Sequence, residues 1–344
     1  MSLCVLVVEW VQQESMNCYR EEKVMTVEDI KQVASIGGGV IGSSWTLLFA
    51  MQGMKVYQYD INEEQIEQCK ENINQNIESL IEFGAIKNED KQEIKNNIFY
   101  TTSIAAAVKD AQFIQENGPE RLPIKQSILA EIEESANETA IYASSSSGLL
   151  ISDVTQNAIH PERCVGGHPY NPPHLIPLVE ITYCDATNKE TVQLAKDFYQ
   201  SIGKEAVVLN MECPGYIANR LQLAVYREMI ELVLRGVCTA EDADKSLVYG
   251  PGIRWAIFGH NMIMQLGNPN GLKAMMEMLG SGGDDWLADM ADWKHMPQNY
   301  GDIAQESVNQ MMKEFPEYIG HTNKEISKYR DKMLIDILKL HKKF

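Results

Sequence analysis

The chain has 344 residues, of which 44% are hydrophobic, and its formal net charge at pH 7 is −18. This length is sufficient for two domains, and no dense basic run opposes the acidic balance, so nucleic acid and anionic membranes are excluded as expected partners. No apolar stretch is long enough to span a bilayer. The seven cysteines have an odd count and no C-x-x-C spacing, so we expect reduced thiols, no metal site and a cytoplasmic protein.

The first 24 residues differ from the rest of the chain. They contain a short apolar run, Leu3 to Val8, which no basic residue precedes and which Glu9 interrupts. This pattern is a poor signal peptide. Met25 begins a normal lead into a first strand, so residues 1–24 are expected to be an N-terminal extension or tag. A genuine N-terminal arm is the alternative.

One complete β-α-β unit is predicted between Val33 and Asp60. A β-like run ends at Ile36, a segment that fits G-x-G-x-x-G follows, and a helix then extends to about Gly53. A second strand ends directly before Asp60, about 20 residues beyond the glycines, where a dinucleotide site needs an acid. The residues expected to bind the cofactor here are Gly37, Gly39, Val40, Ile41, Gly42 and Asp60.

Each part of this unit has a physical role in binding a dinucleotide. Gly37 permits a tight turn, Gly39 lets the backbone approach a pyrophosphate, and Gly42 lets the helix pack close to the strand. The helix N-terminus supplies free N–H donors to the phosphates. Asp60 can accept hydrogen bonds from a ribose diol and repels a 2′-phosphate, so NAD is expected rather than NADP. A glycine-rich loop that only reverses the chain is the alternative, and it leaves the spacing of Asp60 to chance.

Helices and strands continue to alternate up to about residue 209. Helices are predicted over 62–84, 88–96, 103–110, 123–136 and 187–202, and strands over 98–101, 111–115, 140–144, 179–182 and 206–209. Two loops follow strands directly, at the edge of an open α/β sheet that faces a ligand. In the first, Glu116 and Glu120 lie either near the cofactor or simply in solvent. In the second, the serines from Ser144 to Ser147 either bind a ligand or cap the next helix.

A proline-rich segment from Gly166 to Ile181 contains the candidate acid–base pair. Its four prolines exclude a regular helix, and we expect His168 and Glu180 to meet across the resulting loop. A histidine oriented by a carboxylate is the usual general acid–base arrangement, because the carboxylate fixes the tautomer of the ring. His174 has no such partner in the pattern and is expected to be structural.

Strand signals become scarce beyond Pro214. Amphipathic helices follow one another to the end of the chain, with capping-box patterns that begin at Thr239 and Thr322. We therefore predict a Rossmann-type, doubly wound α/β domain over residues 25–213 and an all-helical domain over residues 214–344. Asn219 lies at the junction, where it makes either a hinge hydrogen bond or a substrate contact.

Residues from about Lys31 to Gly259 resemble the 3-hydroxyacyl-CoA dehydrogenase family. The resemblance rests on the glycine segment, the ENGPE loop, the serine run and the segments HPYNPP, PLVE and CPGYIANRL. It implies a Rossmann domain, a helical domain that mediates homodimer formation, and hydride transfer between NAD and the C3 hydroxyl or keto group of a substrate.

The family's site residues fall on matching positions of this chain. The resemblance makes His168 the general base and Glu180 the carboxylate that stabilises the imidazolium. It makes Ser147 and Asn219 ligands of the substrate oxygen, with Ser146 one position from Ser147, and it places Glu120 beside the cofactor.

The segment GPGIRWA points to a branch of the family that acts on free hydroxy acids. It resembles the L-carnitine dehydrogenases and the lambda-crystallin or L-gulonate 3-dehydrogenase type. Arg254 is expected to bind a substrate carboxylate, and Trp255, with Phe258 nearby, to face a trimethylammonium group. Alternatively, Arg254 forms an ordinary ion pair and the aromatic residues belong to the core.

The resemblance therefore implies oxidation of a short L-3-hydroxy acid by NAD, with L-carnitine and its product 3-dehydrocarnitine as the preferred pair. A 3-hydroxyacyl-CoA dehydrogenase of the 3-hydroxybutyryl-CoA type and an L-gulonate 3-dehydrogenase are the alternatives. A non-catalytic, NAD-binding structural protein is a further alternative from a different class.

Overall fold

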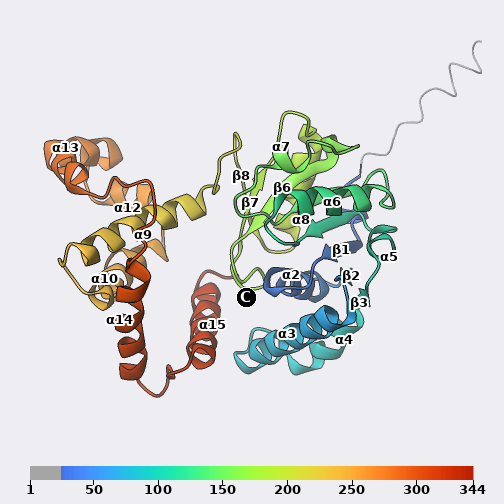
Figure 1. The fold of residues 1–344 in the computed structure, drawn as a ribbon, viewed down its shortest axis with the longest axis horizontal. Helices are drawn as coiled ribbons and strands as arrows, with labels where there is room; N and C mark the ends of the chain where they lie inside the picture. Colours follow the sequence, from blue (N-terminus) through green and yellow to red (C-terminus); the bar gives the residue numbers. More distant parts are fainter. Residues whose placement is uncertain (1–24, 344) are drawn as a thin grey trace, which may run out of the picture.

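The computed structural model describes residues 25–343, so the expected extension, residues 1–24, lies outside the described residues. An eight-stranded sheet forms the centre of residues 25–213, called here the sheet region (Figure 1). Its strands are β1 (Gln32–Ile36), β2 (Lys55–Tyr59), β3 (Ile98–Thr101), β4 (Phe113–Glu116), β5 (Ile141–Ser144), β6 (Cys164–Pro169), β7 (Leu178–Thr182) and β8 (Glu205–Val208). The spatial order is β3-β2-β1-β4-β5-β6-β7-β8. The pairing of β6 with β7 is antiparallel and the other pairings are parallel, so β7 and β8 run opposite to the remaining six strands.

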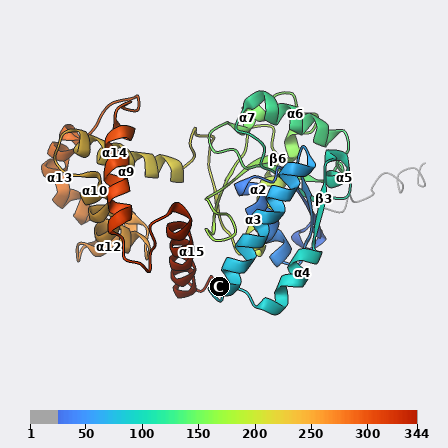
Figure 2. The same cartoon turned by 60° about the horizontal axis from the view of Figure 1, so that its bottom comes forward.

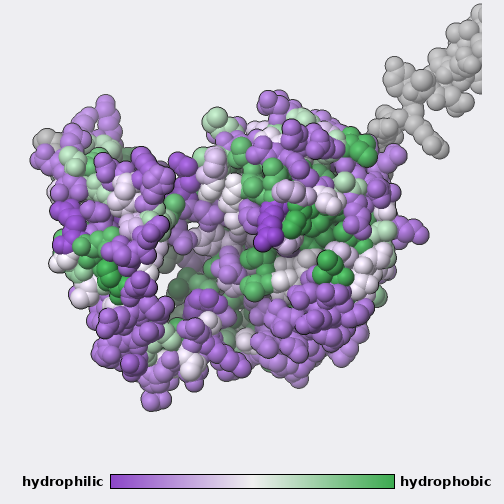
Figure 3. Space-filling view, viewed as in Figure 1, coloured by the Kyte–Doolittle hydropathy of each residue, from purple (hydrophilic) through white to green (hydrophobic). Residues whose placement is uncertain are grey.

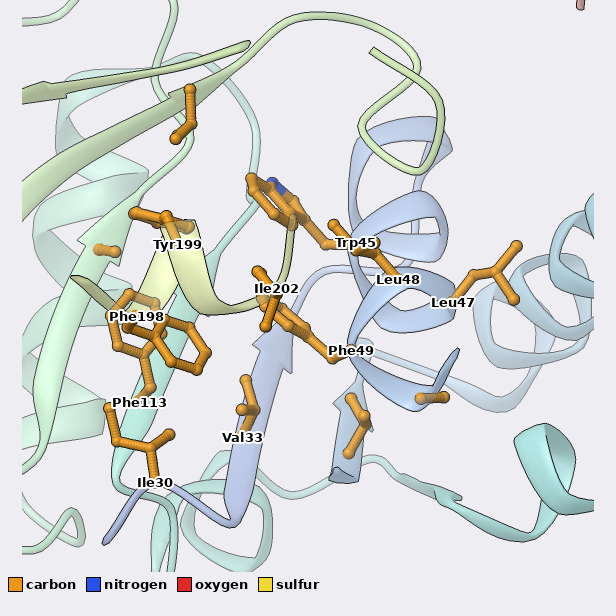
Figure 4. Close-up of a cluster of buried hydrophobic side chains, with 14 of the residues drawn as sticks. Ile30, Val33, Trp45, Leu47, Leu48, Phe49, Phe113, Phe198, Tyr199 and Ile202 are labelled. Atoms are coloured by element: carbon orange, nitrogen blue, oxygen red, sulfur yellow. The ribbon is translucent and has the colours of Figure 1, made fainter. Parts of the chain in front are cut away.

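Helices cover both faces of this sheet, which confirms the predicted doubly wound α/β class. They are α2 (Val40–Met51), α3 (Glu63–Glu82), α4 (Lys91–Asn96), α5 (Ile104–Val108), α6 (Leu122–Glu133), α7 (Ile151–Val154) and α8 (Lys189–Ser201), with single 3-10 turns at Val27–Asp29, Asn88–Asp90 and Pro161–Arg163. One buried core lies under α2, α3 and α8, and a second lies under α5, α6 and α7. Aromatic rings fill the first core, where Trp45 stacks on Phe49 at 5.3 Å and Phe113 meets Phe198 at 4.3 Å between ring centroids (Figure 4).

Strand β6 is the one strand of the sheet that the sequence analysis did not predict. Its two glycines have low strand propensity, and the prolines that follow also argue against a strand. The structure explains the glycines through close packing. A Cβ at Gly166 would lie 2.4 Å from Thr182 Cγ2, and one at Gly167 would lie 2.1 Å from Tyr199 Oη. His168 therefore lies on a strand and not in a loop.

Residues 214–322, called here the helical region, contain no strand (Figures 1 and 2). The elements are α9 (Ala218–Leu234), α10 (Ala240–Leu247), a π-helical turn (Val248–Gly252), α11 (Ile253–Trp255), α12 (His260–Leu266), α13 (Gly271–Asp289) and α14 (Tyr300–Glu314). The predicted capping box at Thr239 is present, with Thr239 Oγ1 accepting from Asp242 N at 3.1 Å. Within residues 25–343, no helix combines the length and the apolar character that a membrane crossing requires.

Helix α15 (Asn323–Leu340) returns from the helical region to the sheet region (Figures 1 and 2). Ile335 and Leu338 are buried in the core under α2 and α3, and Lys339 Nζ donates to the Phe83 carbonyl at 2.8 Å. Just beyond α15, His341 Nε2 hydrogen-bonds the Ala256 carbonyl at 2.6 Å. The end of α15 therefore contacts both regions of the molecule.

Candidate active site

The glycine turn between β1 and α2 has the shape that a dinucleotide phosphate site needs. Gly37 has a φ of +97°, and a Cβ at Gly42 would lie 1.7 Å from the Gly37 carbonyl oxygen, so both positions require glycine. A Cβ at Gly39 would meet no atom within 4 Å, which leaves open space directly before the first turn of α2. Val40, which is exposed, and Ile41 form this turn. The turn fits the pyrophosphate of NAD.

Asp60 follows β2 at the same edge of the sheet. Its Oδ2 accepts from the Gly38 N–H at 2.7 Å, and its Oδ1 accepts from the Ile61 N–H at 2.7 Å. The carboxylate is therefore fixed against the glycine turn, which is the position expected for the ribose-binding acid of a dinucleotide site.

Glu120 organises the serine loop that follows β5. Its Oε1 accepts from Ser146 Oγ at 2.6 Å and from the N–H groups of Ser147, Gly148 and Leu149 at 3.0, 2.9 and 3.3 Å. Burial raises the pKa of the Glu120 carboxyl, but these hydrogen bonds and nearby Lys125 outweigh it and lower the pKa overall. Glu120 thus holds exposed Ser147 at the carboxyl edge of the sheet.

Glu116, the other acid of the ENGPE loop, points into the protein and is completely buried. Its carboxylate accepts from Lys125 Nζ at 2.9 and 3.0 Å, from Ser144 Oγ at 2.7 Å and from the Gly118 N–H at 2.6 Å. Sequence reasoning did not identify Lys125 as its partner, since a lysine in an amphipathic helix ordinarily faces solvent. This ion pair fixes the loops that carry Glu120 and the serines.

The antiparallel pairing of β6 and β7 places His168 directly opposite Glu180. His168 Nδ1 lies 3.0 Å from Glu180 Oε2, and both residues are buried. Glu180 Oε1 accepts from the N–H groups of Ile217 and Ala218, at 2.8 and 2.9 Å, where α9 begins. Burial raises the pKa of Glu180, but the hydrogen bonds from His168 and these two N–H groups outweigh it and lower the pKa overall. An ionised Glu180 accepts a hydrogen bond from Nδ1–H, which leaves Nε2 of a neutral His168 as a hydrogen-bond acceptor.

Tyr216 supports the His168 ring, a contact that sequence reasoning missed. The two rings stack with centroids 4.7 Å apart and an interplanar angle of 8°. Tyr216 has a φ of +51°, an uncommon conformation outside glycine, which turns the chain from the CPG segment into α9. The glycine at position 215 hinted at a turn, but no sequence signal indicated the stacking.

Asn219 brings the first turn of α9 to the serine loop. Its Nδ2 donates to the Ser147 carbonyl at 3.3 Å, and its backbone follows Ala218, which binds Glu180. Hydrogen bonds thus bring His168, Glu180, Asn219 and Ser147 to one junction between the sheet region and the helical region. Within residues 25–343, no group of three or more His, Cys, Asp or Glu residues is arranged to hold a metal ion.

Arg254 and Trp255 lie on α11, in the helical region, and both are exposed. Trp255 Nε1 donates to His260 Nδ1 at 3.1 Å. Among the described residues, no hydrogen bond or ion pair joins Arg254 to another side chain or to the junction that holds His168. Ala256, two residues beyond Arg254, is attached through its carbonyl to His341.

The glycine turn with Asp60, beside a histidine–carboxylate pair at one edge of a doubly wound sheet, defines an NAD-dependent oxidoreductase. The family model for the 3-hydroxyacyl-CoA dehydrogenase NAD binding domain matches residues 32–213, and the model for the C-terminal domain of that enzyme matches residues 215–327. The chain belongs to the 3-hydroxyacyl-CoA dehydrogenase family.

Relatives with assigned names fall into more than one branch of this family. A 3-hydroxyacyl-CoA dehydrogenase of Gibberella moniliformis is 38% identical over 293 residues, covering 83% of this chain and 88% of the relative. An L-carnitine dehydrogenase of Bacillus cereus is 34% identical over 326 residues, covering 93% and 95%. The crystal structure of an NAD-dependent 5-formyl-3-hydroxy-2-methylpyridine 4-carboxylic acid 5-dehydrogenase has a TM-score of 0.73 at 24% identity, covers 91% of this chain and 97% of that one, and shows the shared fold.

Proposed function

We propose that this protein oxidises the C3 hydroxyl of a short L-3-hydroxy acid with NAD, and that L-carnitine, giving 3-dehydrocarnitine, is its substrate. The observation that carries the reaction type is the His168–Glu180 pair, held at 3.0 Å beside the Asn219–Ser147 contact. The substrate class is supported by the L-carnitine dehydrogenase relatives and by Arg254, an exposed guanidinium with no ion pair among the described residues.

His168 acts as the general base in this proposal. Its Nε2 accepts the hydroxyl proton of the substrate while Nδ1 donates to Glu180, so the carboxylate stabilises the imidazolium that forms. NAD, when bound, accepts the hydride from C3. Tyr216 holds the ring plane by stacking, and the α9 backbone holds the carboxylate.

Ser147 and Asn219 position the substrate oxygen. The Ser147 hydroxyl is exposed and the Asn219 amide already reaches the Ser147 backbone, so both donors can face one ligand atom at this junction. Each such hydrogen bond can lower the barrier by about 2–4 kcal/mol as negative charge develops on the oxygen.

Arg254 and Trp255 are the proposed contacts for the two ends of carnitine. A guanidinium binds a free carboxylate through two parallel hydrogen bonds, which a thioester does not offer. The indole face of Trp255 attracts a quaternary ammonium. Because His341 ties the next residue, Ala256, to the end of α15, the α11 segment has a fixed attachment beside the sheet region.

A 3-hydroxyacyl-CoA substrate is the second candidate. The relative from Gibberella moniliformis, which carries that enzyme name, favours it. An L-gulonate 3-dehydrogenase and a non-catalytic NAD-binding protein remain further outcomes of the test below.

We also propose that the protein forms a homodimer through its helical region. Large apolar side chains are exposed over this region (Figure 3), and they include Leu221, Leu223, Tyr226, Val248, Tyr249, Ile257, Phe258, Leu266, Trp286 and Leu287. Exposed apolar side chains in this number favour an interface with a second protein surface. A monomeric mass in solution at micromolar concentration would contradict this part of the proposal.

The test compares NADH formation at alkaline pH with L-carnitine, L-gulonate, L-3-hydroxybutyrate and L-3-hydroxybutyryl-CoA. Turnover on carnitine is expected, and Arg254→Ala should raise KM for it about 10–100-fold through loss of charge-assisted hydrogen bonds. Arg235→Ala is the matched control, since that arginine pairs with Asp289 on the surface at 2.9 Å. Turnover confined to the CoA thioester, or an unchanged KM in Arg254→Ala, would overturn the free-acid assignment.

A further inference from the structure

Lys204 is a buried lysine that makes no ion pair with a carboxylate among residues 25–343. It directly precedes β8, and only 4% of its surface is exposed. Its Nζ donates to the carbonyls of Pro173 and Ile176, both at 2.7 Å, and lies 4.9 Å from the centre of the Trp45 ring. The Lys204 ammonium therefore joins two parts of the protein. It contacts the loop of residues 170–177 through the two carbonyls, and helix α2 through the Trp45 ring.

The same loop is attached to α2 a second time, through Ser44. The His174 N–H donates to Ser44 Oγ at 2.8 Å, and the Ser44 hydroxyl lies 2.7 Å from His174 Nδ1. The Ser44 hydroxyl can donate to Nδ1 of a neutral ring while its oxygen accepts the backbone N–H. Burial lowers the pKa of His174 to about 4, helped by Lys204 and Arg330, which agrees with a neutral ring.

This loop connects the two parts of the candidate active site. It begins directly after β6, which carries His168, and ends directly before β7, which carries Glu180. Helix α2, to which the loop is attached, begins at the glycine turn that fits the pyrophosphate of NAD. The two anchors therefore fix the distance between the base and the helix that carries the cofactor.

We propose that Lys204, together with Ser44, is a positioning residue that holds loop 170–177 on α2 and so places His168 correctly for proton removal beside the cofactor. This inference rests on the proposed function of His168. Burial lowers the pKa of Lys204 to about 7, yet a neutral amine keeps two N–H donors, one for each carbonyl, so the anchor operates in both protonation states.

The expected effect is on turnover and not on cofactor affinity. Reacting atoms must approach within about 3–3.5 Å, and a displacement of about 1 Å can cost about 100-fold in rate. Lys204→Met keeps the length of the side chain but removes its donors. We expect kcat, expressed per NADH-binding site, to fall about 10–100-fold. The Kd of NADH, measured by fluorescence titration, should change less than about threefold.

Three further variants make the test specific. Lys204→Arg restores donors to the site and should recover part of the lost kcat, which a loss of fold would not allow. Lys109→Met, at an exposed lysine that follows α5, is the matched control and should leave kcat unchanged. Ser44→Ala removes the second anchor with a smaller change. If Lys204→Met does not fold, Ser44→Ala should still lower kcat without weakening NADH binding.

The outcomes separate this inference from the proposed function. An unchanged kcat in both anchor variants, with His168→Ala inactive, would overturn the positioning role and leave the proposed function standing. A parallel loss of kcat and NADH affinity would also overturn it, because the anchors would then serve the cofactor site alone. Wild-type turnover in His168→Ala would overturn the proposed function itself, whatever the anchor variants show.

Discussion

Glu180→Gln is the substitution that tests the proposed base most directly, because both oxygens of this carboxylate accept hydrogen bonds and an amide has only one oxygen. Oε1 accepts two N–H groups from the start of α9, and Oε2 accepts from His168 Nδ1. A glutamine has one oxygen and one NH2 group. If the oxygen faced His168, the NH2 group would oppose two N–H donors and lose two hydrogen bonds, each worth about 1.5–3 kcal/mol with a charged acceptor. The oxygen is therefore expected to face α9.

In that orientation the NH2 group faces Nδ1, and His168 must carry its proton on Nε2. The nitrogen that should accept the substrate proton then carries one already. General base catalysis contributes about 10²–10⁴-fold, so kcat should fall by this factor. One charge-assisted hydrogen bond is lost, so the free energy of unfolding should also fall by about 1.5–3 kcal/mol.

The assay is NADH formation together with NADH titration and urea unfolding. Glu190→Gln, at an exposed position on α8, is the control and should match the wild type. Because hydrogen bonding lowers the Glu180 pKa below 4.5, its stabilisation is complete above that pH and is lost as the pH falls through the folded pKa. The stability difference should therefore shrink below pH 4.5. A kcat within about threefold of the wild type would refute the assignment of His168 as the base.

Substitutions of Asp60, Lys125 and His174 test three other contacts of the protein. Asp60→Ala should weaken NAD binding about tenfold and reduce the preference over NADP, measured by titration with both cofactors; an unchanged preference would contradict the ribose assignment. Lys125→Met leaves the Glu116 carboxylate buried and unpaired, so urea unfolding should show a loss of about 3–5 kcal/mol, and a loss below about 1 kcal/mol would contradict the pairing argument. In the folded protein the pKa of His174 is about 4, below its usual 6.5. The contribution of the neutral ring to the free energy of unfolding is therefore complete above pH 6.5 and is lost as the pH falls towards 4. Between pH 6.5 and pH 4 the free energy of unfolding should fall by about 3 kcal/mol more in the wild type than in His174→Gln. Parallel curves of unfolding free energy against pH for the two proteins would refute this prediction.

Local sequence patterns were sufficient to predict most of the sheet region. Residues Val33 to Asp60 form the predicted β-α-β unit, because the turn, the strand and the acid depend on neighbours in the chain. Strand β6 was missed because Gly166 and Gly167 are dictated by Thr182 and Tyr199, which lie outside any local window. The sequence pattern predicted a loop at these residues, but pairing with β7 makes them a strand.

The supporting contacts of the candidate site were the least predictable. The sequence indicated His168 and Glu180, but not the ring of Tyr216 or the anchors at Lys204 and Ser44. Each of these depends on elements far apart in the chain that meet only in the folded protein. Single-residue propensities contain no information about such pairs.

The return of α15 to the sheet region has a consequence for biosynthesis. Ile335 and Leu338 complete a core whose other members lie almost entirely before residue 209. At about 5–20 residues per second, roughly 6–25 s separate the synthesis of residue 213 from that of residue 338. During this interval the nascent chain exposes apolar surface beside α2 and α3. This apolar surface is therefore a defined target for chaperones that bind ribosome-associated chains. Arrest of translation within α14 should leave the surface uncovered.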